Sequence, residues 1–256
     1  MDSAAGIAGS TTRNRRASAG SGMQILVGTS GYSYKEWKGS FYPEKLKNAE
    51  MLRYYAERFS AVEINNTFYR MPKASMLEGW AGQVPSDFLF VLKASQQITH
   101  RKRLKEAGEP LAYLLETAAT IGERLGPVLF QLPPYFKKDL ARLRDFLALL
   151  PDGRPYAFEF RHETWSDDEV REALRERNCA LVCADTEGSG EGAPIVSTAD
   201  WGYLRLRRCD YTEAELRPWV DRIRAQPWGR VFVFFKHEDD RPLAWKTIRR
   251  FKDELG

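Results

Sequence analysis

Charged and hydrogen-bonding side chains recur near the ends of short apolar runs along this sequence. Three carboxylates, Glu63, Glu159 and Asp185, share such positions with the cationic residues Lys93, Arg161, Arg205 and Arg207 and with the amides Asn65 and Gln131. Arg and Lys side chains can bind a phosphate or carboxylate, while a carboxylic acid whose pKa is tuned by neighbouring cations can transfer protons. The pattern predicts a mixed-charge site for an anionic substrate, with a set of purely structural ion pairs as the alternative.

The sequence has three histidines, His100, His162 and His237, and each follows one of these apolar runs. Histidine titrates near neutral pH, so we expect at least one of them to act as an acid, a base or a ligand. A mononuclear metal site built from these histidines with Glu63, Glu159 or Asp185 is an alternative. The chain has no HExxH-type spacing, and we assign no metal ligand and no cofactor.

Aromatic residues are concentrated after the first apolar run, in the segment SGYSYKEWKGSFYPEK, which contains Tyr32 and Trp37. Such side chains can stack on a sugar or a nucleobase, and packing over the end of a sheet is the alternative. The basic segment HRKRLK, residues 100–105, is more typical of a solvated helix start than of a nucleic-acid contact.

The elements that must position these residues are eight short runs rich in Val, Ile, Leu and Phe, separated by amphipathic helical patterns. The predicted strands are Gln24–Thr29, Ala61–Asn65, Phe88–Ala94, Pro127–Leu132, Tyr156–Arg161, Ala180–Asp185, Gly202–Arg207 and Arg230–Lys236. Alternation of this kind predicts one (β/α)8 TIM-like barrel, with an open doubly wound sheet as the alternative. The Gly-rich segment DTEGSGEGAP replaces a helix after the sixth strand.

Strand parity then sorts the polar residues. In AVEIN, Val62 and Ile64 suit the helix layer, so Glu63 and Asn65 point inward. By the same alternation we expect an inward orientation at the following positions: Lys93, Gln131, Glu159, Arg161, Asp185, Arg205 and Arg207. Catalytic groups of such barrels lie at the carboxyl ends of the strands, where these residues are found.

The chain has 256 residues, a net charge of +4 and a composition of 43% hydrophobic and 29% charged residues, which excludes fibrous and membrane-spanning classes.

Residues 1–22 are small, polar and Gly/Ser-rich, and we expect a disordered tail before a domain at 23–256. Because structured sequence begins at Met23, the tail is interpreted as an upstream extension from a misassigned start codon, with a basic targeting arm as the alternative. The tail carries +2 of the charge, so no polyanion partner follows from composition. Three cysteines without CxxC spacing predict a cytoplasmic protein.

The ordered segments VGTSGYSYKEWKGSFYP, VEINNTFYRMP, LKASQQITH, LFQLPP, EFRHETW and YLRLRR resemble the signature segments of the YecE-like family, a domain of unknown function. The resemblance runs from about Gln24 to the C-terminus and implies a TIM-like barrel. It also implies recurrent polar positions, which are Gly28, Ser30, Glu63, Asn65, Tyr69, Arg70, Lys93, His100, Gln131, Glu159, Arg161 and His162. Many members look like YxRLHG and FNN where this chain has YLRLRRCDY and FFKHED, so Arg207 and His237 depart from the common pattern.

We therefore expect a hydrolase or lyase that acts on an anionic, phosphate-bearing substrate, either a small molecule or a nucleic-acid fragment. The predicted catalytic residues are Glu63, Glu159, His162 and His100. The predicted substrate-binding residues are Asn65, Tyr69, Arg70, Lys93, Gln131, Arg161, Asp185, Arg205, His237, Tyr32 and Trp37. The alternatives are a metal-dependent phosphodiesterase or isomerase and a non-catalytic binder of nucleic acid or a metabolite.

Overall fold

The computed structural model describes residues 22–186, 193–208, 211–236 and 244–255. Of the predicted tail, the described residues include only Gly22. His237, Cys209 and most of the Gly-rich segment after the sixth predicted strand also lie outside the described residues.

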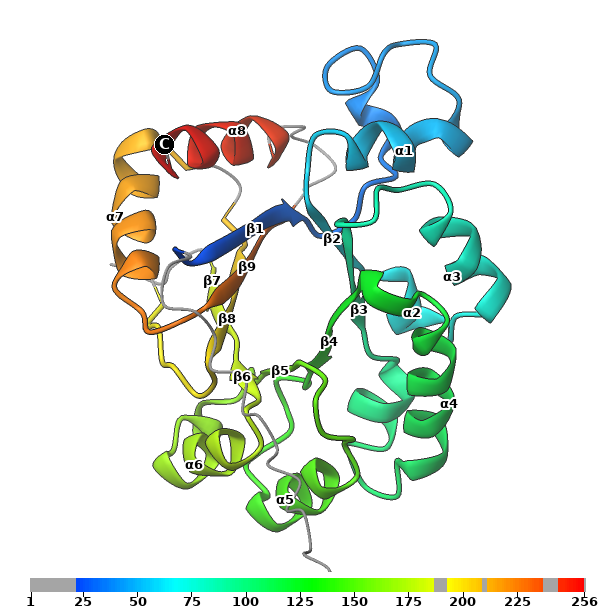
Figure 1. The fold of residues 1–256 in the computed structure, drawn as a ribbon. Helices are drawn as coiled ribbons and strands as arrows, with labels where there is room; N and C mark the ends of the chain where they lie inside the picture. Colours follow the sequence, from blue (N-terminus) through cyan, green and yellow to red (C-terminus); the bar gives the residue numbers. More distant parts are fainter. Residues whose placement is uncertain (1–21, 187–192, 209–210, 237–243, 256) are drawn as a thin grey trace, which may run out of the picture.

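Parallel strands alternate with helices through the described part of the chain, which confirms the α/β class. The strands are β1 (Gln24–Thr29), β2 (Ala61–Ile64), β3 (Leu89–Lys93), β4 (Leu125–Gln131), β5 (Tyr156–Glu159), β6 (Ala180–Leu181), β7 (Cys183–Asp185), β8 (Trp201–Leu206) and β9 (Arg230–Phe235). The helices are α1 (Met51–Ala56), α2 (Asn66–Tyr69), α3 (Ala74–Ala81), α4 (Gly108–Ala119), α5 (Leu140–Ala148), α6 (Asp168–Glu176), α7 (Glu213–Arg224) and α8 (Ala244–Leu255). Figure 1 shows the strands around a common centre with the larger helices outside them.

Hydrogen bonding divides the strands into two parallel sheets and does not form one closed eight-stranded barrel. One sheet has the order β1-β9-β8-β7 and the other the order β2-β3-β4-β5-β6. The predicted sixth strand is the point of division on one side, because it breaks at Val182 into β6, which pairs with β5, and β7, which pairs with β8. The sequence prediction of one continuous strand over Ala180–Asp185 is therefore wrong.

The sheets also meet between β1 and β2, where a side chain takes the place of a ladder of backbone bonds. The Tyr55 hydroxyl donates to the Ala61 carbonyl oxygen at 3.2 Å and accepts from the Thr29 N–H at 2.8 Å. Beyond it, the Gly31 N–H donates to the Glu63 carbonyl oxygen at 2.8 Å. Tyr55 thus satisfies backbone groups that a continuous sheet would pair with each other.

One apolar cluster receives side chains from strands of both sheets. Its members include Leu26, Ala61, Val91, Leu129, Ala157, Ala180, Val182, Tyr203 and Phe232. The opposite faces of the strands pack against the helices in two further clusters. The two sheets therefore enclose a shared interior, as a barrel does. Among the described helices, none is both long and apolar enough to cross a membrane.

The close approach of β1 to β2 depends on Gly28. A Cβ atom at this position would lie 2.0 Å from the Ala61 carbonyl oxygen. We expect Gly28→Ala to lower the free energy of unfolding by about 1–3 kcal/mol, the usual cost of overpacking, because a strand backbone has to move. Thermal or urea unfolding measures the change.

Gly79 in α3 provides the matched control, since a Cβ atom there would meet nothing within 4 Å. Gly79→Ala is expected to raise stability by about 0.5–1 kcal/mol through the lower entropy of the unfolded chain. Equal stability of Gly28→Ala and the wild type would show that the contact between β1 and β2 does not constrain the fold.

Candidate functional site

A cavity of about 500 Å³ lies at the carboxyl ends of the strands. Its lining consists of Ser30, Tyr34, Asn65, Phe68, Tyr69, Lys93, Gln96, His100, Gln131, Arg161, Arg205, Arg207 and Lys236. We call this cavity the strand-end pocket. It brings together side chains from both sheets, at the end of the strands where sequence parity predicted a site.

Strand alternation explains why the polar groups meet. On each of five strands, a polar residue comes two positions after a residue of the interior apolar cluster, so both side chains point to the same side. The pairs are Ala61 and Glu63, Val91 and Lys93, Leu129 and Gln131, Ala157 and Glu159, and Tyr203 and Arg205. The interior is thus apolar below and polar in the layer that borders the pocket.

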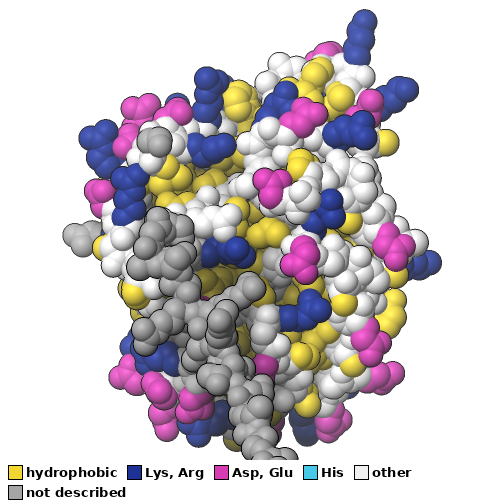
Figure 2. Space-filling view, in the orientation of Figure 1, with side chains coloured by type: hydrophobic (Ala, Val, Ile, Leu, Met, Phe, Trp, Pro, Cys, Tyr) yellow, Lys and Arg dark blue, Asp and Glu magenta, His cyan; other side chains and the backbone are white. Residues whose placement is uncertain are grey.

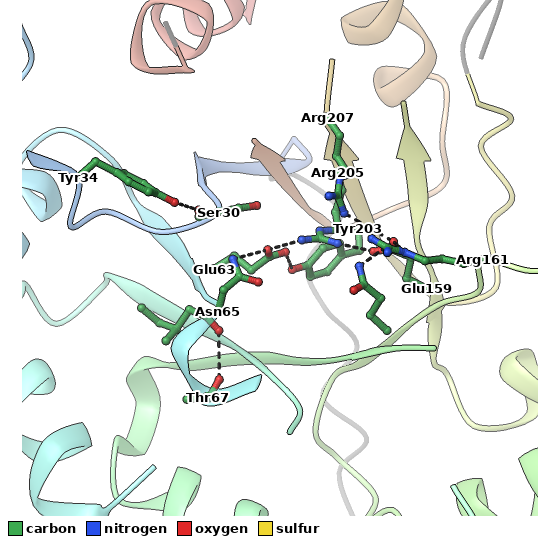
Figure 3. Close-up of polar contacts among 12 residues, drawn as sticks. Ser30, Tyr34, Glu63, Asn65, Thr67, Glu159, Arg161, Tyr203, Arg205 and Arg207 are labelled. Carbon is green, nitrogen blue, oxygen red and sulfur yellow. Dashed lines mark hydrogen bonds and ion pairs between the residues drawn. The ribbon is translucent and has the colours of Figure 1, made fainter. Parts of the chain in front are cut away.

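The polar layer is built around Arg205, which is 3% exposed. Its Nη2 donates to Glu63 Oε1 at 2.7 Å, and its Nη1 donates to Glu159 Oε2 at 2.5 Å. Figure 3 shows the guanidinium between the two carboxylates. Arg205 comes from β8 of one sheet, whereas Glu63 and Glu159 come from β2 and β5 of the other. We call these three residues the arginine clamp.

The other carboxylate oxygens also have donors. The Tyr203 hydroxyl donates to Glu63 Oε2 at 2.7 Å, and Asn65 Nδ2 lies 3.3 Å from Glu63 Oε1. Gln131 Nε2 donates to Glu159 Oε1 at 2.8 Å, and Arg161 Nε donates to the same oxygen at 3.1 Å. Buried charges of this kind are stable only when they are paired and hydrogen-bonded, and both carboxylates meet that condition.

These contacts keep both carboxylates ionised. Burial alone would raise the pKa of Glu159, but Arg205, Arg161 and the hydrogen bond from Gln131 lower it to about 2. Burial likewise opposes ionisation of Glu63, while Arg205 and the hydrogen bonds from Tyr203 and Ser30 bring its pKa below the ordinary value. An acid with so low a pKa is a weak base near neutral pH.

Two other groups in the pocket titrate nearer to neutral pH. Burial, followed by repulsion from Arg205, lowers the pKa of the Lys93 ammonium to about 8, although Glu63 and Glu159 oppose the shift. Burial and the cations Lys93 and Arg161 lower the pKa of His100. His100 is therefore neutral at pH 7 and able to accept a proton.

Local backbone geometry presents His100 to the pocket. It lies in a π-helical turn, Gln97–Arg101, directly after β3, and its Nδ1 is 2.9 Å from Thr99 Oγ1. The chain then passes through left-handed conformations at Arg103, Leu104 and Glu106. Such turns and backbone conformations occur often at functional sites. The segment 100–105 is therefore a tight turn and not the helix start that its charges suggested.

The predicted aromatic contacts divide between surface and core. Tyr69 is 73% exposed at the rim of the pocket. Tyr32 lines a neighbouring hollow of about 370 Å³ that shares Tyr34 and Asn65 with the strand-end pocket. Trp37 is fully buried in the core, so it has no surface that a substrate could contact. For Trp37 the structure therefore shows core packing, which was the alternative to ligand stacking. Arg70 is exposed and does not line the pocket.

The predicted inward orientation of Asp185 is wrong. Ala180, Val182 and Ala184 contact the interior cluster, so Cys183 and Asp185 face the helix layer. There Asp185 Oδ2 accepts from Arg208 Nε at 2.9 Å and from the Tyr211 hydroxyl at 2.7 Å.

His162 is also outside the pocket lining. Its Nδ1 accepts from the Thr164 N–H at 3.2 Å and begins a short 3₁₀ turn. His237 lies outside the described residues.

Sequence reasoning did not identify several residues of the pocket and of the polar layer beneath it. Tyr203, which bonds to Glu63 in that layer, shares the parity of Arg205 and Arg207 in GYLRLR, so the same alternation could have found it. Phe68 lies in the short helix α2 after β2, and Gln96 directly precedes the π-helical turn after β3, so no strand periodicity applies to either residue. Lys236 lines the pocket at the end of β9, where parity alone did not choose among three polar residues.

Within the described ranges, no group of three or more His, Cys, Asp or Glu side chains is placed to hold a metal ion.

A family model described as "Protein of unknown function DUF72" matches residues 26–256. The chain is 31% identical to the UPF0759 protein YunF of Bacillus subtilis over 236 residues, which cover 87% of this chain and 82% of YunF. It is 33% identical to the UPF0759 protein YecE of Escherichia coli over 141 residues, which cover 53% of this chain and 52% of YecE.

Solved structures show the same fold. A DUF72 family protein of Thermotoga maritima is similar with a TM-score of 0.78 and 28% identity, covering 91% of this chain and 99% of that protein. A DUF72 family protein of Enterococcus faecalis has a TM-score of 0.74 at 19% identity, covering 91% of this chain and 95% of the other, which supports the fold alone.

The arginine clamp predicts a specific dependence of stability on pH. Because the pKa of Glu159 is lowered in the folded state to about 2, the stability it contributes is present above its unfolded pKa of about 4.3 and is lost as pH falls toward 2. We expect Glu159→Gln to lower the free energy of unfolding at pH 7 by about 3–5 kcal/mol, since it leaves Arg205 incompletely paired. The variant should also lose part of the decline between pH 5 and pH 2, measured by urea unfolding at several pH values.

Glu163→Gln is the control, because Glu163 is exposed in the 3₁₀ turn that follows β5. We expect it to change stability by less than about 0.5 kcal/mol. Equal stability of Glu159→Gln and Glu163→Gln at pH 7 would contradict a stabilising role for the clamp.

Proposed function

Because the chain belongs to the DUF72 family of proteins of unknown function, its activity has to be inferred from its site, and we propose that it is a hydrolase or lyase that acts on a phosphate-bearing small molecule in the strand-end pocket. We further propose that the two sheets act as one TIM-like barrel whose strand ends form this site.

The charge of the pocket lining carries the proposal. Among the described residues that line it, five are cationic, Lys93, Arg161, Arg205, Arg207 and Lys236, and none is a carboxylate. The two nearest carboxylates lie in the layer beneath and are bonded to Arg205. A small cavity with this lining attracts an anion, and guanidinium groups bind phosphate oxygens with particular strength.

Arg161 and Arg207 are the cations best placed to bind the substrate. Their side chains are 34% and 20% exposed, compared with 4% for Arg205. Arg161 Nε bonds to Glu159, which orients its guanidinium group. In this assignment, Arg205 supports the site while Arg161 and Arg207 contact the phosphate group.

Proton transfer is assigned to His100 and Lys93. The predicted acid-base roles of Glu63 and Glu159 are replaced by positioning roles, because both carboxylates accept several strong hydrogen bonds and have lowered pKa values. His100 lines the pocket and is neutral at pH 7, so it can accept a proton from water or from the substrate. His162 keeps the role of capping a turn.

The alternative of a nucleic-acid binder has less support. Trp37 is buried, and Figure 2 shows Lys and Arg interspersed with Asp and Glu on the face it presents. Nucleic-acid binding favours basic residues clustered on one face.

We also propose a cytoplasmic location, since Cys179 and Cys183 are free and buried, as is typical of proteins in a reducing compartment.

Phosphate binding tests the proposal. Titration calorimetry at constant ionic strength would compare inorganic phosphate and glucose 6-phosphate with glucose. We expect binding only with the phosphate group, and a loss of about 10- to 100-fold in affinity for Arg161→Gln or Arg207→Gln, because each removes a charged hydrogen-bond donor. Arg144→Gln, on the exposed side of α5, is the matched control and should bind as the wild type does. Equal binding of glucose and glucose 6-phosphate, or no binding of any phosphate, would reject the proposal.

Turnover is tested with a panel of phosphorylated metabolites, followed by mass spectrometry of the products. For any compound that is converted, His100→Asn is expected to reduce kcat by about 100-fold or more while binding is retained, as for the loss of a general acid or base. His162→Asn is the control and should keep its activity. The opposite result for the two histidines would reject the assignment of His100.

A further inference from the structure

We propose that Lys93 is a nucleophile that forms an imine with the carbonyl group of a phosphorylated aldehyde or ketone. This inference rests on the proposed function, because the cations of the strand-end pocket have to hold the phosphate group. It narrows the substrate class from phosphate esters in general to phosphates that also carry a carbonyl group.

The contacts of Lys93 differ from those of the other buried cation in the site. Lys93 is the last residue of β3 and is 9% exposed. Its Nζ makes no hydrogen bond or ion pair with any residue that the structure describes, and it lies 4.2 Å from the centre of the Phe68 ring. Arg205, in contrast, is paired with two carboxylates. A buried amine without a carboxylate partner is poorly explained as a structural charge.

The surroundings of Lys93 also favour its neutral, nucleophilic form. Burial and the nearby cations Arg205 and Arg161 lower the pKa of the Lys93 ammonium to about 8. At pH 7.5 roughly a quarter of such amines are neutral, compared with roughly one in a thousand for an ordinary lysine. Desolvation and neighbouring cations are the means by which enzymes activate lysine for attack on a carbonyl group.

The reaction needs no oxidant and no further reactant. The neutral Nζ donates its electron pair to the carbonyl carbon, the carbonyl oxygen takes up a proton, and a carbinolamine forms. The hydroxyl group then leaves as water after a second proton transfer, and a C=N⁺ bond remains. His100, which lines the same pocket, is the group available to move these protons.

The product explains why the amine would be useful. A protonated imine withdraws electrons from the adjacent carbon, so a neighbouring C–C or C–H bond can break with its electron pair moving toward nitrogen. Arg161 and Arg207 would fix the phosphate end of the substrate at the same time. Of the two reaction classes in the proposed function, this chemistry favours the lyase.

Pyridoxal 5′-phosphate is a suitable probe because it is an aldehyde with a phosphate group, and 5-deoxypyridoxal, which carries a methyl group in place of the phosphate ester, is the matched control. The protein is incubated with either compound and treated with borohydride, which reduces the imine to a stable secondary amine, and the modified peptide is identified by mass spectrometry. We expect pyridoxal 5′-phosphate to label Lys93 at least about tenfold faster than the exposed Lys73 and Lys105, as the difference in the fraction of neutral amine requires. Inorganic phosphate should protect Lys93, and labelling should increase as pH rises through 8.

Two variants separate the inference from the function on which it rests. Lys93→Arg keeps the charge but cannot form the imine, so the label at position 93 should be lost, whereas binding of inorganic phosphate to the wild type tests the proposed function separately. Arg161→Gln keeps the Lys93 amine but removes a cation that holds the phosphate group, so pyridoxal 5′-phosphate should label Lys93 more slowly in this variant. Should Lys93→Arg fail to fold, the protection by phosphate and the pH dependence in the wild type still test the inference.

The outcomes are distinguishable. Phosphate binding together with labelling spread over exposed lysines, or labelling of Lys93 that does not depend on the phosphate group of the probe, would overturn the imine and leave the proposed function standing. Absence of binding by inorganic phosphate and by pyridoxal 5′-phosphate would overturn both.

Discussion

Arg205 lies between two buried carboxylates that belong to the opposite sheet, and the arrangement of the site follows from this contact. A buried guanidinium group without partners would be far too costly, so Glu63 and Glu159 are required to neutralise it. Two carboxylates exceed the charge of one arginine, and Arg161 together with donors from Tyr203, Asn65 and Gln131 meets the excess. The clamp also joins sheets that share no continuous ladder between β1 and β2.

The clamp decides which groups remain for chemistry. Its carboxylates resemble catalytic acids in the sequence, yet the hydrogen bonds that stabilise them make them poor proton acceptors near neutral pH. Burial among cations lowers the pKa of the Lys93 ammonium to about 8, closer to neutral pH, and burial with the same kind of neighbours lowers the pKa of His100, which favours its neutral form. The same positive charge therefore makes Glu63 and Glu159 weak bases and favours the neutral forms of Lys93 and His100.

Strand alternation allowed much of this layer to be predicted from sequence, because in Ala61–Ile64 and the strands like it the interior side holds one small or apolar residue followed by one polar residue. It failed at Asp185 because Ala180, Val182 and Ala184 occupy the interior, and a polar group on the helix side finds its own partners in Arg208 and Tyr211. Between β1 and β2 the backbone groups of Thr29 and Ala61 bond to the Tyr55 hydroxyl, which comes from a helix and leaves no trace in strand patterns. Likewise, nothing in its local sequence distinguishes the buried Trp37 from an aromatic residue that binds a ligand.

The layered construction has an evolutionary consequence. Glu63, Glu159 and Arg205 cannot be exchanged one at a time without leaving a buried charge, so a descendant of this protein would keep all three even if its substrate changed. The rim carries no such constraint, because Tyr69 is exposed and Arg207 lies 3.9 Å from its nearest carboxylate oxygen. Divergence of specificity would begin at the rim, while the base of the pocket would remain recognisable long after the ancestral reaction had been lost.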